Sequence, residues 1–180
     1  FAVSGGVKVN LPMIAAGDVL WLQATYSDGA NSYAGFGGNL NQGRTNLFLA
    51  DAVVDRSGNL RTTEIFNVHA AFLHYWTPQV RQSLFGTYGR IDVANAVQTG
   101  FVAGAVALGN VPFTDSEYFQ VGSNLIYSPV RDLDIGVEIL YREVDPRRRV
   151  ISAEPAFAGT QRSVGQQDTF EGRFRIQRDF

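Results

Sequence analysis

The amino-acid sequence predicts an all-β protein in which antiparallel strands run up and down to form a transmembrane β-barrel. Three observations lead to this fold class. Apolar and polar residues alternate in seven segments, the connections between these segments are alternately short and long, and the 180 residues include 19 glycines and 12% aromatic side chains. Period-two alternation indicates strands with one apolar and one polar face, while glycine favours turns and aromatic residues favour strands.

The alternation begins at the first residue. In residues 1–11, Val7 and the other valines alternate with small or polar residues such as Lys8, and in residues 19–28 Leu22 lies at the centre of an apolar row. Because successive side chains of a strand point to opposite faces, each segment predicts a strand with one apolar face.

The next two segments, residues 64–76 and 80–88, are less regular. Ile65 and Leu73 interrupt the polar face of the first, and Phe85 falls on the polar side of the second. The remaining positions keep the period of two, so we predict strands here as well.

The last three segments are residues 117–128, 133–142 and 169–180. The final one is the most regular, because phenylalanine and isoleucine alternate along it with charged or polar residues. All seven segments are close to the length of about 9 to 11 residues with which a tilted strand crosses the hydrocarbon layer of a membrane.

The connections are sorted by length. The short ones are residues 12–18, 77–79 and 129–132, and the long ones are residues 29–63, 89–116 and 143–168. Tight turns at one end and long loops at the other are typical of outer-membrane barrels. Aromatic residues near the segment ends predict two interfacial bands, formed by Trp21, Tyr26, Tyr75, Trp76, Tyr88, Phe119, Tyr127, Tyr141 and Phe180.

The free energy of charge burial predicts which face meets lipid. An arginine on the lipid face costs about 2 to 4 kcal/mol at mid-depth, so the row that contains Arg173 must face the lumen and the row that contains Phe174 must face lipid. The same reasoning gives a set of lumen-facing, pore-lining residues: Lys8, Arg81, Asp134, Glu138, Arg142, Glu171, Arg173 and Arg175. A polar row repeated over many strands favours a water-filled pore.

Two roles remain open for these charges. Arg173 and Arg175 could form the positive side of an electric field across the pore, since charged walls select ions. They could equally pair with Glu171, Glu138 or Asp134 on neighbouring strands as structural ladders.

Composition excludes several other functions. The net charge is −2, with 15 basic and 17 acidic residues, so no basic surface is expected for nucleic acid. Cysteine is absent, and His69 and His74 are five positions apart and would point to opposite faces of a strand. We find no catalytic motif. We therefore expect no enzyme activity, no metal site and no cofactor.

Seven antiparallel strands leave the first and the last running in the same direction. They cannot close into an even-stranded barrel, so we expect residues 1–180 to form part of a single barrel domain, with further strands preceding residue 1.

Six motifs resemble the porins of alphaproteobacteria, the rhizobial and Brucella type. They are GGVKVNLP (5–12), AAGD (15–18), YSDGA (26–30), HYWTP (74–78), SPV (128–130) and FRIQRDF (174–180). The resemblance implies a homotrimer of 16-stranded barrels in the bacterial outer membrane, with these residues as the C-terminal half and the last seven strands. It also implies passive diffusion of small hydrophilic solutes, with the constriction loop in the N-terminal half and outside this sequence.

The resemblance also suggests partners. A terminal aromatic residue, Phe180, looks like the signal read by the outer-membrane assembly machinery, and the basic run Arg147, Arg148 and Arg149 could contact lipopolysaccharide or simply be solvated. The alternative to a channel is an outer-membrane or soluble β-barrel used for adhesion, structure or ligand binding.

Overall fold

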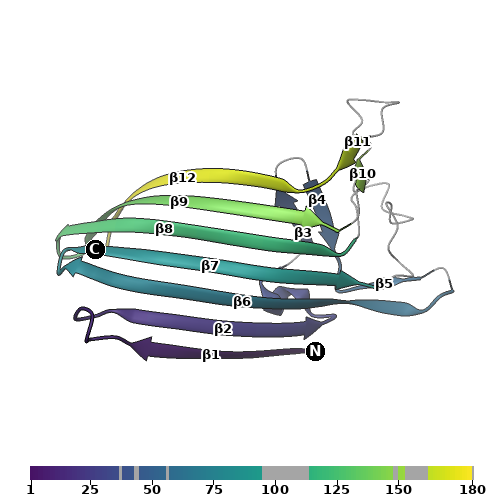
Figure 1. Ribbon diagram of the computed structural model, residues 1–180, viewed down its shortest axis with the longest axis horizontal. Helices are drawn as coiled ribbons and strands as arrows, with labels where there is room; N and C mark the ends of the chain where they lie inside the picture. Colours follow the sequence, from purple (N-terminus) through teal and green to yellow (C-terminus); the bar gives the residue numbers. More distant parts are fainter. Residues whose placement is uncertain are drawn as a thin grey trace.

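A computed structural model describes residues 1–36, 38–42, 45–55, 57–94, 114–147, 150–152 and 162–179. Its main feature is one antiparallel sheet whose seven long strands each pair with their neighbours along the chain (Figure 1). In spatial order these are β1 (Ala2–Asn10), β2 (Val19–Asp28), β6 (Leu60–Thr77), β7 (Val80–Val93), β8 (Ser116–Val130), β9 (Leu133–Pro146) and β12 (Gln167–Arg178). The predicted all-β, up-and-down fold is confirmed.

The sheet is open in the part of the chain that the structure describes, because β1 and β12 are its two edges and do not pair with each other. The described residues contain no helix with the length and hydrophobicity of a transmembrane span.

The shorter elements lie in the long connections. The first connection contains the 3₁₀ helix η1 (Asn31–Ala34), the hairpin of β3 (Gly38–Gln42) and β4 (Thr45–Leu49), and β5 (Ala52–Val54), which pairs with β6. The third contains the hairpin of β10 (Val150–Ser152) and β11 (Arg162–Val164). The short connections are turns, so all short turns lie at one end of the sheet and all long connections at the other (Figure 1).

Strand register defines two faces of the sheet. One continuous row of paired residues crosses all seven strands as Val7, Leu22, Ala70, Gly86, Val121, Tyr141 and Phe170. We call the face that carries this row the outer face. Its large apolar side chains are exposed, as at Ile139 (68%) and Phe174 (67%), so this face presents a broad hydrophobic surface.

Aromatic side chains bound this surface at the end of the long connections. They are Tyr26, Phe66, Tyr88, Phe119, Tyr141 and Phe170, all on the outer face. On β6 the apolar row runs from Phe66 to Trp76, about 33 Å along the strand. At a tilt of about 40° this corresponds to a height of about 25 Å, which matches the apolar band of membrane barrels. Two residues that were predicted to lie in the aromatic bands do not lie there, because Trp21 and Tyr75 point to the face opposite the outer one.

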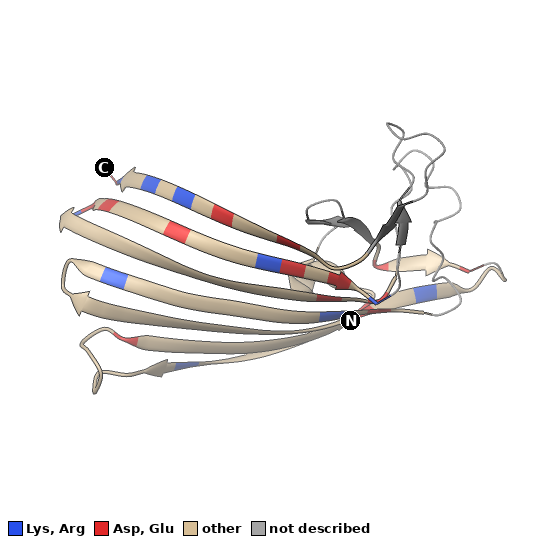
Figure 2. Ribbon diagram, turned by 45° about the horizontal axis from the view of Figure 1, so that its top comes forward, with Lys and Arg blue, Asp and Glu red and all other residues tan. Residues whose placement is uncertain are grey.

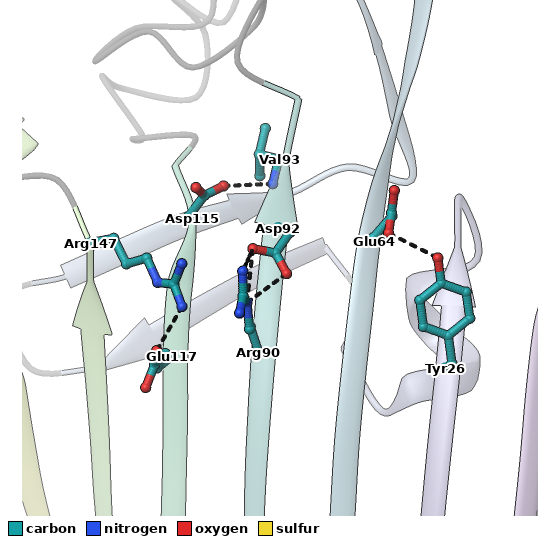
Figure 3. A network of polar contacts seen from close by, with 8 residues as sticks. All are labelled: Tyr26, Glu64, Arg90, Asp92, Val93, Asp115, Glu117 and Arg147. Carbon is teal, nitrogen blue, oxygen red and sulfur yellow. Dashed lines mark hydrogen bonds and ion pairs between the residues drawn. The ribbon is translucent and has the colours of Figure 1, made fainter.

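Charged residues follow directly beyond the aromatic band on the outer face. Figure 3 shows part of this row, in which the hydroxyl of Tyr26 donates a 2.9 Å hydrogen bond to Glu64 and Arg90 forms a 2.7 Å ion pair with Asp92. This change from aromatic to charged residues indicates where the membrane ends and water begins.

The strands extend beyond their predicted ends on this side. β7 continues to Val93 and β9 to Pro146 because the alternation persists with its polarity inverted. Ile91 and Val144 lie on the face opposite the outer one and are fully buried, while charged residues occupy the outer positions. The small hydrophobic core of the described residues therefore lies at the end of the long connections.

Candidate functional site

The face opposite the apolar surface, which we call the inner face, carries all eight ionisable residues that the sequence singled out. A second continuous row of paired residues crosses the sheet as Lys8, Trp21, Ala71, Phe85, Gly122, Leu140 and Glu171. Each remaining member lies an even number of positions from this row and so shares its face: Arg81, Asp134, Glu138, Arg142, Arg173 and Arg175. Figure 2 shows the charged positions spread along the strands.

Three of these arginines form ion pairs on the inner face. Arg173 on β12 lies 3.4 Å from Glu138 of β9 and 3.2 Å from Glu171 of its own strand. Glu171 also lies 3.1 Å from Arg142 of β9, so one chain of charges links the two strands. Arg173 is therefore balanced by two carboxylates, as the structural-ladder interpretation expects.

The third of these arginines, Arg81, forms its ion pair nearer the short turns. A guanidinium nitrogen of Arg81 on β7 lies 2.5 Å from Asp134 of β9, and Ser128 both accepts a 2.7 Å hydrogen bond from Arg81 and donates a 2.6 Å bond to Asp134. This arrangement ties β7 to β9 across the intervening strand β8 and fixes the orientation of both charged groups.

Lys8 and Arg175 have no ion pair within 4 Å among the side chains that the structure describes. The ammonium of Lys8 lies 5.7 Å from the centre of the ring of Trp21, its partner on β2, and the two form a cation–π contact on the inner face. Five of the eight inner-face residues are cationic and three are acidic, so the set carries a positive excess.

Uncharged polar groups complete the face on β1, β2, β6 and β7. Ser4 and Thr25 share a 2.9 Å hydrogen bond, Gln23 donates a 3.0 Å bond to Ser4, and His69 pairs with Thr87 at 2.8 Å. Such groups are suited to a wet surface, because they can form hydrogen bonds with water as well as with neighbouring side chains.

Phe85 is an exception on this face that packing explains. A Cβ atom on Gly122 would lie 2.6 Å from its ring, so the glycine on the paired strand makes room for the phenylalanine.

His69 and His74 point to opposite faces, as predicted. His74 lies 2.6 Å from Asp18, a carboxylate in the turn before β2 whose side chain is fully buried. Burial alone would raise the pKa of Asp18, but the hydrogen bonds from His74 and from the backbone N–H of Tyr75 (2.9 Å) outweigh burial and lower it. Across the described part of the chain, no group of three or more His, Asp or Glu could hold a metal ion.

Sequence reasoning missed one feature of the inner face. Residues of the first long connection fold onto it, and Ala34, Phe36 and Leu49 are buried against Ile65 and other strand residues. The signal was present in the strands, because at this end apolar residues such as Ile65, Ile91 and Val144 occupy inner positions of β6, β7 and β9.

Three predicted residues lie outside the described part of the chain, namely Arg148, Arg149 and Phe180. Arg147 is described and forms a 3.0 Å ion pair with Glu117 of β8 (Figure 3). Its charge is thus partly balanced within the protein.

Comparisons with known proteins agree with this geometry. A family model described as the porin subfamily matches residues 1–173. The searches of curated proteins and of solved structures found no match. An antiparallel sheet with one apolar and one polar face, bounded by an aromatic band, is the architecture of a membrane barrel wall. The chain belongs to the porin subfamily, a family of channel proteins of the bacterial outer membrane.

Proposed function

We propose that the inner face lines a water-filled channel through which small hydrophilic solutes and ions diffuse passively. The observation that carries this proposal is the separation of the faces: eight ionisable residues from four strands share one face, while the opposite face exposes an apolar surface of about membrane height. With lipid on the apolar side and water on the charged side, the side chains of both faces are in a favourable solvent.

The rest of the barrel has to come from other strands. An open antiparallel edge in lipid leaves backbone N–H and C=O groups without partners, each at a cost of several kcal/mol. The free edges of β1 and β12 thus support a larger barrel, and we propose that this chain forms seven strands, the C-terminal half, of a 16-stranded barrel of the alphaproteobacterial type that assembles as a homotrimer.

Further partners follow from the same proposal. The apolar face contacts outer-membrane lipid, and the charged row beyond the aromatic band meets lipopolysaccharide. The terminal Phe180 acts as the signal for the assembly machinery, a role supported by the sequence pattern alone.

A non-channel barrel is the second candidate. It is favoured by one observation, the segment of the first long connection that covers part of the inner face. A barrel filled in this way could serve adhesion or structure rather than diffusion.

Liposome swelling separates the two candidates. The intact protein is reconstituted into liposomes, which are then placed in iso-osmotic solutions of sugars of increasing size. Swelling that stops above a size limit supports the channel. If correctly folded protein, verified by resistance to denaturation in detergent, gives no swelling with any sugar, the non-channel barrel is the better account.

A further inference from the structure

The first long connection crosses the inner face of the sheet. We define the inner segment as η1 with Gly35 and Phe36, together with β3 and β4. η1 packs against β2 and β6, Phe36 reaches β7 and β8, and β3 lies against β9 and β12. The segment therefore spans the inner face from the second strand of the sheet to the last, at the end of the long connections (Figure 1).

Buried hydrogen bonds attach η1 to its surroundings. The side-chain amide of Asn31 donates a 3.0 Å bond to the carbonyl of Ala50, and its backbone N–H donates a 2.8 Å bond to Asp51. The side-chain amide of Asn67 on β6 donates to the carbonyl of Ala34. Asn31 and Asn67 are fully buried, so breaking either bond would leave polar groups without water.

Phe36 anchors the inner segment to the two central strands it contacts, β7 and β8. Its ring contacts Tyr118 of β8 edge-on at 5.5 Å between centroids. On β7, a Cβ atom on Gly89 would lie 3.2 Å from the ring, so the glycine leaves the space that the phenylalanine occupies. Phe36 is 7% exposed, which makes it an anchor and not a surface residue.

The period of η1 determines which of its residues face away from the sheet. In a 3₁₀ helix, residues three apart share a face. Asn31 and Ala34 are buried against the sheet, so Ser32 and Tyr33 point away from it, and Tyr33 is 77% exposed. The described residues of the inner segment include no charged residue.

We propose that the inner segment narrows the channel at the end of the long connections and that Tyr33 lines the narrowed passage. This inference rests on the proposed channel function. This passage limits the size of the solutes that pass, whereas the ionisable residues nearer the short turns act on ions. A constriction of the pore is thus supplied by this half of the barrel.

Cysteine modification tests the position of Tyr33. These 180 residues contain no cysteine, so in the intact protein, with any cysteine elsewhere replaced by serine, Tyr33→Cys provides a single reactive thiol. Single channels in a planar bilayer are exposed to a water-soluble, cationic methanethiosulfonate reagent. Attachment of the bulky group is expected to cause a stepwise loss of current. The control is Leu60→Cys, which is 67% exposed on the outer side of β6 at the same end and should react with no loss.

Two further variants test whether the ring of Phe36 anchors the inner segment. Phe36→Ala is expected to release the segment, raising single-channel conductance and the size limit for sugars. Gly89→Val should act in the same direction by displacing the ring, and Gly172→Val is its matched control, because no atom lies within 4 Å of a Cβ on Gly172.

The outcomes separate this inference from the proposed function. If the wild-type protein does not conduct, the channel function fails and the inference fails with it. If it conducts, but labelled Tyr33→Cys carries the full current, or the thiol does not react, or Phe36→Ala conducts as the wild type does, then the constriction is refuted and the channel stands.

Discussion

Replacing Val137 with arginine tests which face of the sheet meets lipid. Val137 lies on the outer face near the middle of β9 and is 51% exposed. An arginine at the bilayer midplane costs about 2 to 4 kcal/mol, which lowers the folding equilibrium constant by about 30-fold to 1,000-fold. Urea titration of the intact protein in phospholipid vesicles, followed by tryptophan fluorescence, measures this change.

Two controls make the result specific to face and depth. Asn124→Arg places the same residue on the inner face opposite Glu138, where we expect almost no cost. Glu143→Arg stays on the outer face of β9 but lies beyond the aromatic band, where the cost falls to about 0 to 1 kcal/mol. Equal destabilisation by Val137→Arg and Asn124→Arg would refute the assignment of the two faces.

The remaining predictions concern selectivity, pH and the core. Arg175→Gln should reduce the anion preference of single channels more than Arg173→Gln, because Arg173 is balanced by carboxylates; an unchanged reversal potential in a salt gradient would reject a selective role for Arg175. The pKa of Asp18 is lowered in the folded protein, so its stabilising contribution is present above its unfolded pKa of about 4 and is lost as pH falls through the folded value. The stability difference between wild type and Asp18→Asn in urea should accordingly begin to shrink as pH falls to about 4 and should continue to shrink as the carboxylate of the folded protein is protonated. Ile91→Ala should lower the free energy of unfolding by about 2 to 5 kcal/mol, because Ile91 is fully buried, whereas Arg90→Ala on the adjacent exposed position should cost less.

The strands and their faces were predictable because the membrane imposes a strict pattern. Each crossing strand must place apolar side chains toward lipid and polar ones toward water, and the alternation in residues 19–28 predicted β2 with its observed bounds. The inner-face position of the ionisable residues follows from the same alternation, since a shift of one residue would turn every side chain to the opposite face.

The far ends of the strands were not predictable from this pattern alone. Beyond the aromatic band the outer face meets water and the inner face is covered by the inner segment, so Ile91 and Val144 turn inward where the membrane region has polar residues. The ion pairs could not be predicted either, because the sequence does not determine whether Arg173 pairs with Glu138 or stays unpaired in the lumen. Register and side-chain geometry determine this contact.

Spin-label accessibility along β12 tests the central claim most directly. These 180 residues contain no cysteine, so single labels can be placed at Phe170, Arg173, Arg175 and Ile176 of the intact protein in lipid vesicles once any cysteine elsewhere is replaced by serine. We predict that labels at Phe170 and Ile176 collide with oxygen dissolved in the bilayer, and that labels at Arg173 and Arg175 collide with a water-soluble nickel complex. Labels at Phe170 and Ile176 that are reached by the nickel complex and shielded from oxygen would contradict the account.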